Sequence, residues 1–262
     1  MQSVFTRARK YVERNLAHGL YRRPIAIKSD RAIVSFTFDD FPRSALDTGG
    51  ALLRSYGLAG TYYVALGLLD GTSPSGVICS RADIAKLLDE GHEIGCHTYD
   101  HCHSWNTSPY AFEASINRNR QELQKNFPGQ EFHTLSYPIS EPRPETKRRA
   151  GSHFLACRAG GQVFNRGKAD LNQLSAYFLE RANGDLGAVK ALIRACHKEG
   201  GWLIFATHDV AESPSEFGCS PSFFEDVVSF AVKSGAHVLP VARALNLIQE
   251  QNLPASKASA NA

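Results

Sequence analysis

Residues 32–40, AIVSFTFDD, form an apolar run that ends in two adjacent carboxylates, Asp39 and Asp40. β-Branched and aromatic side chains alternate here with small or hydroxylated ones, which is typical of a buried strand. In parallel α/β architectures, ligand-binding groups collect at the carboxyl ends of the strands. This stretch therefore predicts a central strand whose carboxyl end places two acidic side chains at the ligand-binding edge of the sheet. A strand followed by an ordinary polar turn would have the same sequence pattern.

Length and composition fit one globular domain. The chain has 262 residues, 43% of them hydrophobic and 21% charged, which is ordinary for a folded domain with a substantial core. The net charge of +3 is too small to indicate a nucleic-acid partner. The six cysteines are scattered without a CxxC pair, so we expect free thiols in a reducing compartment.

The N-terminal sequence MQSVFTRARKYVERN has no apolar core and no small-residue cleavage site, so it does not read as a secretory signal. No window contains the roughly 20 apolar residues that a membrane span requires. From these two observations we expect a cytoplasmic protein without a transmembrane segment.

Apolar and basic residues alternate at helical spacing over residues 3–20, which predicts a basic amphipathic helix. Two interpretations stay open: the helix lies on a membrane or a partner, or it packs on its own domain. We treat residues 1–30 as an N-terminal extension, 31–250 as the main domain and 251–262, which lack apolar periodicity, as a disordered tail.

Strand and helix patterns alternate through the main domain. Apolar runs near residues 61–65, 92–96, 132–137, 154–158, 174–179, 202–207 and 237–239 are separated by helical patterns and turn residues. This rhythm favours an α/β fold with a mostly parallel sheet and helices outside, either open or closed into a barrel.

Two histidine stretches follow such strands. His97 and His101 are four residues apart in GHEIGCHTYDH, a spacing that lets both rings face one point if the segment turns helically after the strand. His208 follows the apolar run GWLIFAT. Because imidazole and carboxylate are common metal ligands, three strands that release such residues at one edge indicate a metal site with open coordination positions.

Three stretches together, SFTFDD, HTYDH and FATHDV, resemble the first, second and last motifs of the polysaccharide deacetylase family. The resemblance runs from about residue 32 to residue 247. It implies a distorted (β/α) barrel of about seven strands in a single domain. It also implies a divalent metal, most often Zn²⁺, and removal of acetyl groups from carbohydrate substrates.

Carried over residue by residue, the resemblance makes Asp40, His97 and His101 the metal ligands. Asp39 becomes the general base and His208 the general acid. The third motif aligns with residues 136–140, SYPIS, and places the backbone N–H of Ile139 as an oxyanion donor.

Departures from the family pattern affect the support of the site. Ser136 stands where relatives carry an arginine that orients the base, so we predict that Arg158 takes over this role; an ordinary rim cation is the other interpretation. The tryptophan-bearing fourth motif is not found, and Ala206 replaces a leucine. Tyr137 and Phe41 are predicted sugar-stacking residues, with a place in the core as the alternative.

These residues favour a metal-dependent hydrolase that removes N-acetyl groups from an acetamido sugar, either small, nucleotide-linked or lipid-linked, or an oligosaccharide. Because the sequence shows no export signal, we expect an intracellular precursor. A hydrolase of another linear or cyclic C–N bond stays open, as does a non-catalytic protein that binds carbohydrate or metal. The sequence predicts no oligomeric state.

Overall fold

The computed structural model describes residue 12 and residues 15–253. Its centre is a curled sheet in which every pairing is parallel, in the order β10-β11-β2-β3-β6-β7-β8, with β12 joined to β2. The strands are β2 (Ile33–Phe38), β3 (Thr61–Val64), β6 (Glu93–Cys96), β7 (Thr134–Ser136), β8 (Ala156–Arg158), β10 (Tyr177–Phe178), β11 (Trp202–Thr207) and β12 (His237–Val238).

Strand β2 lies near the middle of this sheet, and all six of its residues are buried. It pairs along its whole length with β11, from Ile33 opposite Trp202 to Phe38 opposite Thr207. Its other edge is shared, with β12 beside the first two residues and β3 beside the last two. The buried central strand that the sequence predicted is therefore confirmed.

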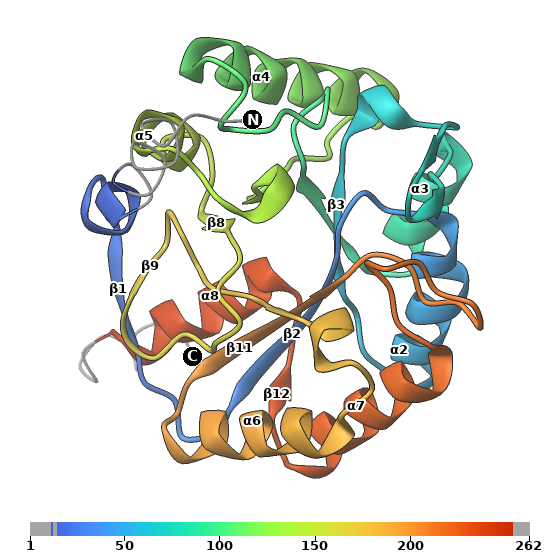
Figure 1. The fold of residues 1–262 in the computed structure, drawn as a ribbon, viewed down its shortest axis with the longest axis vertical. Helices are drawn as coiled ribbons and strands as arrows, with labels where there is room; N and C mark the ends of the chain where they lie inside the picture. Colours follow the sequence, from blue (N-terminus) through green and yellow to red (C-terminus); the bar gives the residue numbers. More distant parts are fainter. Residues whose placement is uncertain (1–11, 13–14, 254–262) are drawn as a thin grey trace.

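The sheet curls toward closure. Leu174, three residues before β10, forms a parallel bridge with Arg158 at the end of β8. The first and last strands of the sheet order thus approach each other through this segment. The predicted single-domain α/β fold, a distorted barrel of about seven strands, is confirmed (Figure 1).

Helices surround the sheet (Figure 1). They are η1 (Ala45–Gly50), α2 (Ala51–Ser55), η2 (Leu66–Leu68), α3 (Arg81–Asp89), α4 (Pro109–Asn126), η3 (Pro138–Ser140), α5 (Pro144–Gly151), η4 (Leu179–Ala182), α6 (Leu186–Lys198), α7 (Pro221–Lys233) and α8 (Val241–Gln251). Ser80 caps α3 in a capping box with Asp83, as a helix start requires. Ser44, directly before η1, does not act as a cap, because its backbone is already helical and its side chain makes no cap bond.

Two apolar clusters form the core. The larger one lies between the sheet and the outer helices and includes Phe36, Phe38, Phe205 and Phe224. A smaller cluster joins the opposite faces of β2 and β11 to helix α8. Both faces of β2 are therefore covered, and its two hydroxylated residues, Ser35 and Thr37, are buried as well.

Two short antiparallel pairs lie outside the main sheet, β1 (Pro24–Ile27) with β9 (Gly167–Asp170), and β4 (Thr72–Ser73) with β5 (Gly76–Val77). β1 begins at Pro24, which is tolerated there because proline fits the first residue of an edge strand.

Of the predicted N-terminal helix, Val12 and residues 15–19 are helical, whereas residues 1–11 and 13–14 lie outside the described residues. Of the predicted disordered tail, residues 254–262 also lie outside them, and Gln251 still belongs to α8. Among the described helices, none combines the length and the apolar character needed to cross a membrane.

Candidate metal centre and active site

The carboxyl ends of four parallel strands bring the candidate residues together. Asp39 and Asp40 follow β2, His97 follows β6, His208 follows β11, and Arg158 is the last residue of β8. Because these strands belong to one parallel sheet, their ends open at the same edge.

Three of these residues converge on one point. The Nε2 atoms of His97 and His101 lie 3.5 and 3.2 Å from Oδ1 of Asp40. One ligand atom from each residue lies within 4.8 Å of the others. The three side chains that the resemblance assigned as ligands therefore form a compact group with room for a shared ion.

The backbone reaches this geometry through left-handed residues. Asp40 and Phe41 have φ values of 60° and 55°, and Thr98 and His101 have values of 58° and 50°. Such values are uncommon outside glycine and cluster at functional sites. The two histidines do not share a helical turn. They converge through bends after β6 that contain two left-handed residues.

His97 is held with one ring nitrogen directed toward Asp40. Its Nδ1 lies 2.8 Å from the carbonyl oxygen of Ser136, to which a neutral ring donates. Burial lowers the pKa of His97 to about 4, against the raising effect of the two neighbouring aspartates. The ring is consequently neutral near pH 7, with a lone pair on Nε2, which is the form that binds metals.

A divalent ion fits this donor set. Oδ1 of Asp40 is buried and accepts no hydrogen bond from the described residues, and buried carboxylate oxygens are normally satisfied. Two imidazoles and one carboxylate also match the ligand types of catalytic zinc sites, which leave positions open for water and substrate. Asp40, His97 and His101 are therefore the residues that would hold the ion.

Asp39 lies beside this group and is paired with a cation. The Arg158 guanidinium contacts the Asp39 carboxylate and also donates to the Ser136 hydroxyl at 2.5 Å. Burial alone would raise the pKa of Asp39, but Arg158, His97 and His208 outweigh it and hold that pKa below its ordinary value. The cation predicted from the neighbouring strand thus lies in contact with the predicted base.

His208 is partly exposed at the same edge. Its Nδ1 lies 3.3 Å from the carbonyl oxygen of Phe217 in the loop after β11. When protonated, His208 lowers the pKa of both Asp39 and Asp40, which places it on the metal side of the sheet. Its neighbour Asp209 is turned away and accepts hydrogen bonds from Ser215.

The third-motif segment forms the tight turn η3 after β7, where Ile139 has a φ of 57° and an exposed side chain. Its assignment as an oxyanion donor stays a prediction. Tyr137 and Phe41, by contrast, are fully buried, and the Tyr137 hydroxyl donates to the carbonyl of Asn172 at 3.0 Å. The prediction that these rings stack on a sugar is wrong, because core packing covers them.

Sequence reasoning missed Glu180. It lies in η4, two residues after β10, and since Phe178 pairs with Ala206, this register carries Glu180 to the level of His208. Its Oε2 is buried without a hydrogen-bond partner among the described residues. Burial, with a smaller contribution from Asp39, raises the pKa of Glu180 to about 7. The only sequence signal was an acid shortly after a short apolar strand.

Comparison with known proteins supports a family assignment. Residues 26–155 match the family model described as polysaccharide deacetylase. No curated protein matches the chain.

Solved structures resemble this chain at low identity. A family 4 acetyl xylan esterase from Clostridium thermocellum, in complex with a cobalt ion, is 21% identical with a TM-score of 0.55, over 82% of this chain and 91% of that one. The peptidoglycan deacetylase PdaC from Bacillus subtilis, as the mutant D285S, is 16% identical with a TM-score of 0.53, over 84% of this chain and 93% of that one. A deacetylase from Streptococcus pyogenes matches over 54% of this chain with 20% identity and a TM-score of 0.47, and the chain spans 62% of its length.

The family match covers the strands that supply Asp39, Asp40, His97 and His101, and the curled parallel sheet agrees with the fold of the esterase and of PdaC. Residues 26–155 of the chain therefore belong to the polysaccharide deacetylase family.

Proposed function

We propose that this protein is a metal-dependent hydrolase that removes N-acetyl groups from an acetamido sugar. The observation that carries the proposal is the convergence of Asp40, His97 and His101 within 4.8 Å, beside an Asp39 that is ion-paired with Arg158. Zn²⁺ is the ion we propose, because two imidazoles and one carboxylate suit it.

When bound, the ion polarises water and the acetyl carbonyl oxygen, which is the chemistry that hydrolysis of an amide needs. Asp39 is the general base. It is held ionised by Arg158, so it is ready to accept a proton from the attacking water at near-neutral pH.

Amines are poor leaving groups, so the departing nitrogen has to receive a proton. His208 is the general acid in this proposal, with Nδ1 directed to the Phe217 carbonyl and Nε2 left to face the substrate. The backbone N–H of Ile139 is the proposed oxyanion donor, and losing such a donor typically costs about 10² to 10³ in rate.

The two adjacent aspartates have different proposed roles, which substitutions can distinguish. We expect the purified protein to hold about one divalent ion and to release acetate from N-acetylated oligosaccharides, nucleotide sugars or lipid-linked sugars. Asp39→Asn should abolish acetate release and leave the metal content nearly unchanged, because Asp39 is the base and not a ligand. Asp40→Asn should lower both.

Metal content is measured by atomic emission and acetate by an enzyme-coupled assay. Loss of metal in Asp39→Asn with retention in Asp40→Asn would reverse the two roles. Ammonia without acetate would instead indicate a hydrolase of another C–N bond. Metal binding without any turnover would identify a non-catalytic protein, consistent with the altered third and fourth motifs.

A further inference from the structure

Val12 and residues 15–19 are helical and Leu20 follows directly; these described residues are called the N-terminal helix here. Their large apolar side chains are turned away from the domain. Val12, Leu16 and Leu20 are 54%, 46% and 42% exposed. They are four residues apart, and a spacing of four places side chains on one face of a helix. Tyr21, directly after the helix, is exposed as well. This apolar face belongs to a surface that the domain does not cover.

The orientation of the helix is fixed by contacts on its other side. Ala17 is buried, and its carbonyl accepts a hydrogen bond from the Lys147 ammonium of α5 at 2.5 Å. Lys147 is itself buried and paired with Asp170 at 2.6 Å. His18 lies 3.3 Å from the Gln173 side chain. Because this side holds the helix to α5 and to the segment after β9, the apolar face points outward.

Positive charge is concentrated in the same part of the sequence. The first 23 residues carry six cations and one acid, a net charge of +5, and since the whole chain is +3, the remaining residues sum to −2. The six cations are Arg7, Arg9, Lys10, Arg14, Arg22 and Arg23, and the acid is Glu13. The N-terminal segment is therefore the basic part of an otherwise slightly acidic protein.

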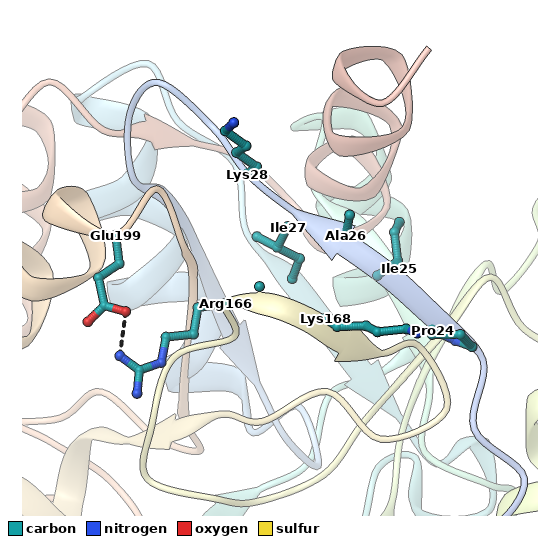
Figure 2. A pocket seen from close by; sticks show the side chains of 9 residues that line it. Pro24, Ile25, Ala26, Ile27, Lys28, Arg166, Lys168 and Glu199 are labelled. Carbon is teal, nitrogen blue, oxygen red and sulfur yellow. Dashed lines mark hydrogen bonds and ion pairs between the residues drawn. The ribbon is translucent and has the colours of Figure 1, made fainter. Parts of the chain in front are cut away.

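The strand pair β1–β9, whose first strand follows the helix in sequence, carries further cations. A groove of about 890 Å³ runs along β1 and β9, and it is lined by Lys28, Lys168, Arg166 and the acid Glu199 (Figure 2). Glu199 is engaged by Arg166. The Arg22 guanidinium donates to the Lys168 carbonyl at 3.4 Å and so joins this strand pair to the end of the helix.

We propose that this helix docks the protein on an anionic phospholipid surface. An apolar helix face with cations close by in the sequence and on the adjoining strand pair is suited to the headgroup region, where burial of apolar side chains and attraction to anionic lipids add together. A second copy of the chain fits this surface less well, because a few exposed side chains fall far short of the roughly 1,200 to 2,000 Å² that a stable protein interface buries. The docking does not depend on the proposed hydrolase activity.

Vesicle sedimentation with the full chain tests the proposal. We expect the protein to sediment with phosphatidylcholine vesicles that contain 30 mol% phosphatidylglycerol, and not with phosphatidylcholine alone. Leu16→Glu should weaken the partition by about tenfold, and Leu16→Glu with Leu20→Glu by more, because apolar burial is lost and like charge is added. Added salt should also weaken binding, since the attraction is partly electrostatic.

Val232→Glu is the matched control, because Val232 is exposed on α7, and its partition should equal that of the unaltered protein. Circular dichroism and acetate release from a soluble substrate should be unchanged in all three variants, which separates this test from that of the hydrolase. Failure of the unaltered protein to bind the anionic vesicles, or equal binding by the double variant, would overturn the proposal. A dimer that the double variant converts to a monomer, without vesicle binding, would assign the surface to a second copy instead.

Discussion

Arg158 shows how one residue can hold a buried acid from a neighbouring strand. Its guanidinium contacts the Asp39 carboxylate and donates to the Ser136 hydroxyl of the adjacent strand β7. The small side chain of Ser136 leaves space that this cation occupies. The ion pair therefore joins the end of β8 to the residue after β2.

Arg158→Met should be strongly destabilising, because it leaves the buried Asp39 carboxylate without its cation. Breaking a buried pair from one side typically costs about 3 to 5 kcal/mol in the free energy of unfolding. We also expect acetate release to fall by about 10² or more, since the base loses its orientation. Urea unfolding and the acetate assay measure the two effects.

Arg166→Met is the matched control. It breaks an ion pair with Glu199 that is largely exposed, so it should cost less than about 1 kcal/mol. Equal effects of the two variants on stability would contradict the role given to Arg158.

Helix α4 illustrates how an element is positioned by one buried polar residue. Asn119 is fully buried, and its side chain accepts from the Leu66 N–H at 3.0 Å and donates to the Val64 carbonyl at 2.8 Å. The Leu66 N–H just after β3 thereby gains an acceptor, and the Val64 carbonyl gains a second donor beside the His97 N–H. These bonds fix the helix against the sheet. The spacing of residues in this segment cannot show which amide faces inward, so this anchor was not predicted.

Asn119→Ala should lower the free energy of unfolding by about 1 to 3 kcal/mol, since the Leu66 N–H loses its acceptor while the Val64 carbonyl keeps the His97 N–H. Thermal and urea unfolding measure the change. Asn126→Ala lies on the same helix, where the side chain bonds only to Glu122 within its own helix, and it should change stability by less than about 1 kcal/mol. A difference between the two variants that falls within error would show that Asn119 does not anchor the helix.

At the scale of the whole molecule, Glu180 makes stability depend on pH. Burial raises its pKa from an ordinary 4.5 to about 7, so between these values the folded state keeps a proton that the unfolded state has lost. Stability then falls as pH rises through this window, and the full cost is present above pH 7. Glu180→Gln removes the cost and should stabilise the metal-free protein by about 2 to 3 kcal/mol at pH 8, but little at pH 4.5.

Urea unfolding at several pH values between 4.5 and 8 measures this difference. Glu225→Gln, on the exposed face of α7, is the control, and its stability should stay parallel to that of the unaltered protein throughout. If the stability of Glu180→Gln also stayed parallel to that of the unaltered protein at every pH, the Glu180 carboxyl would not have a raised pKa.

Much of the architecture could be predicted because it depends on local patterns. The apolar run before Asp39 and the run before His208 are long enough to identify two central strands, and the alternation of elements indicates parallel pairing. What escaped prediction depends on three-dimensional contacts. The left-handed residues after β2 and β6, the burial of Tyr137 and the approach of Glu180 are set by packing between segments far apart in sequence, which no local pattern records.

The pairing of β2 with β11 has a consequence for how the chain acquires its shape during synthesis. Thr37 bonds to the Phe205 carbonyl, a partner 168 residues further along. During translation, β2 and the two aspartates therefore leave the ribosome long before β11, the strand that pairs with β2. Contacts between segments so distant in sequence form slowly. We expect β2 to stay without its β11 partner until translation is nearly finished, so the nascent chain should be a chaperone substrate. The proposed active site should form only in the last steps of folding.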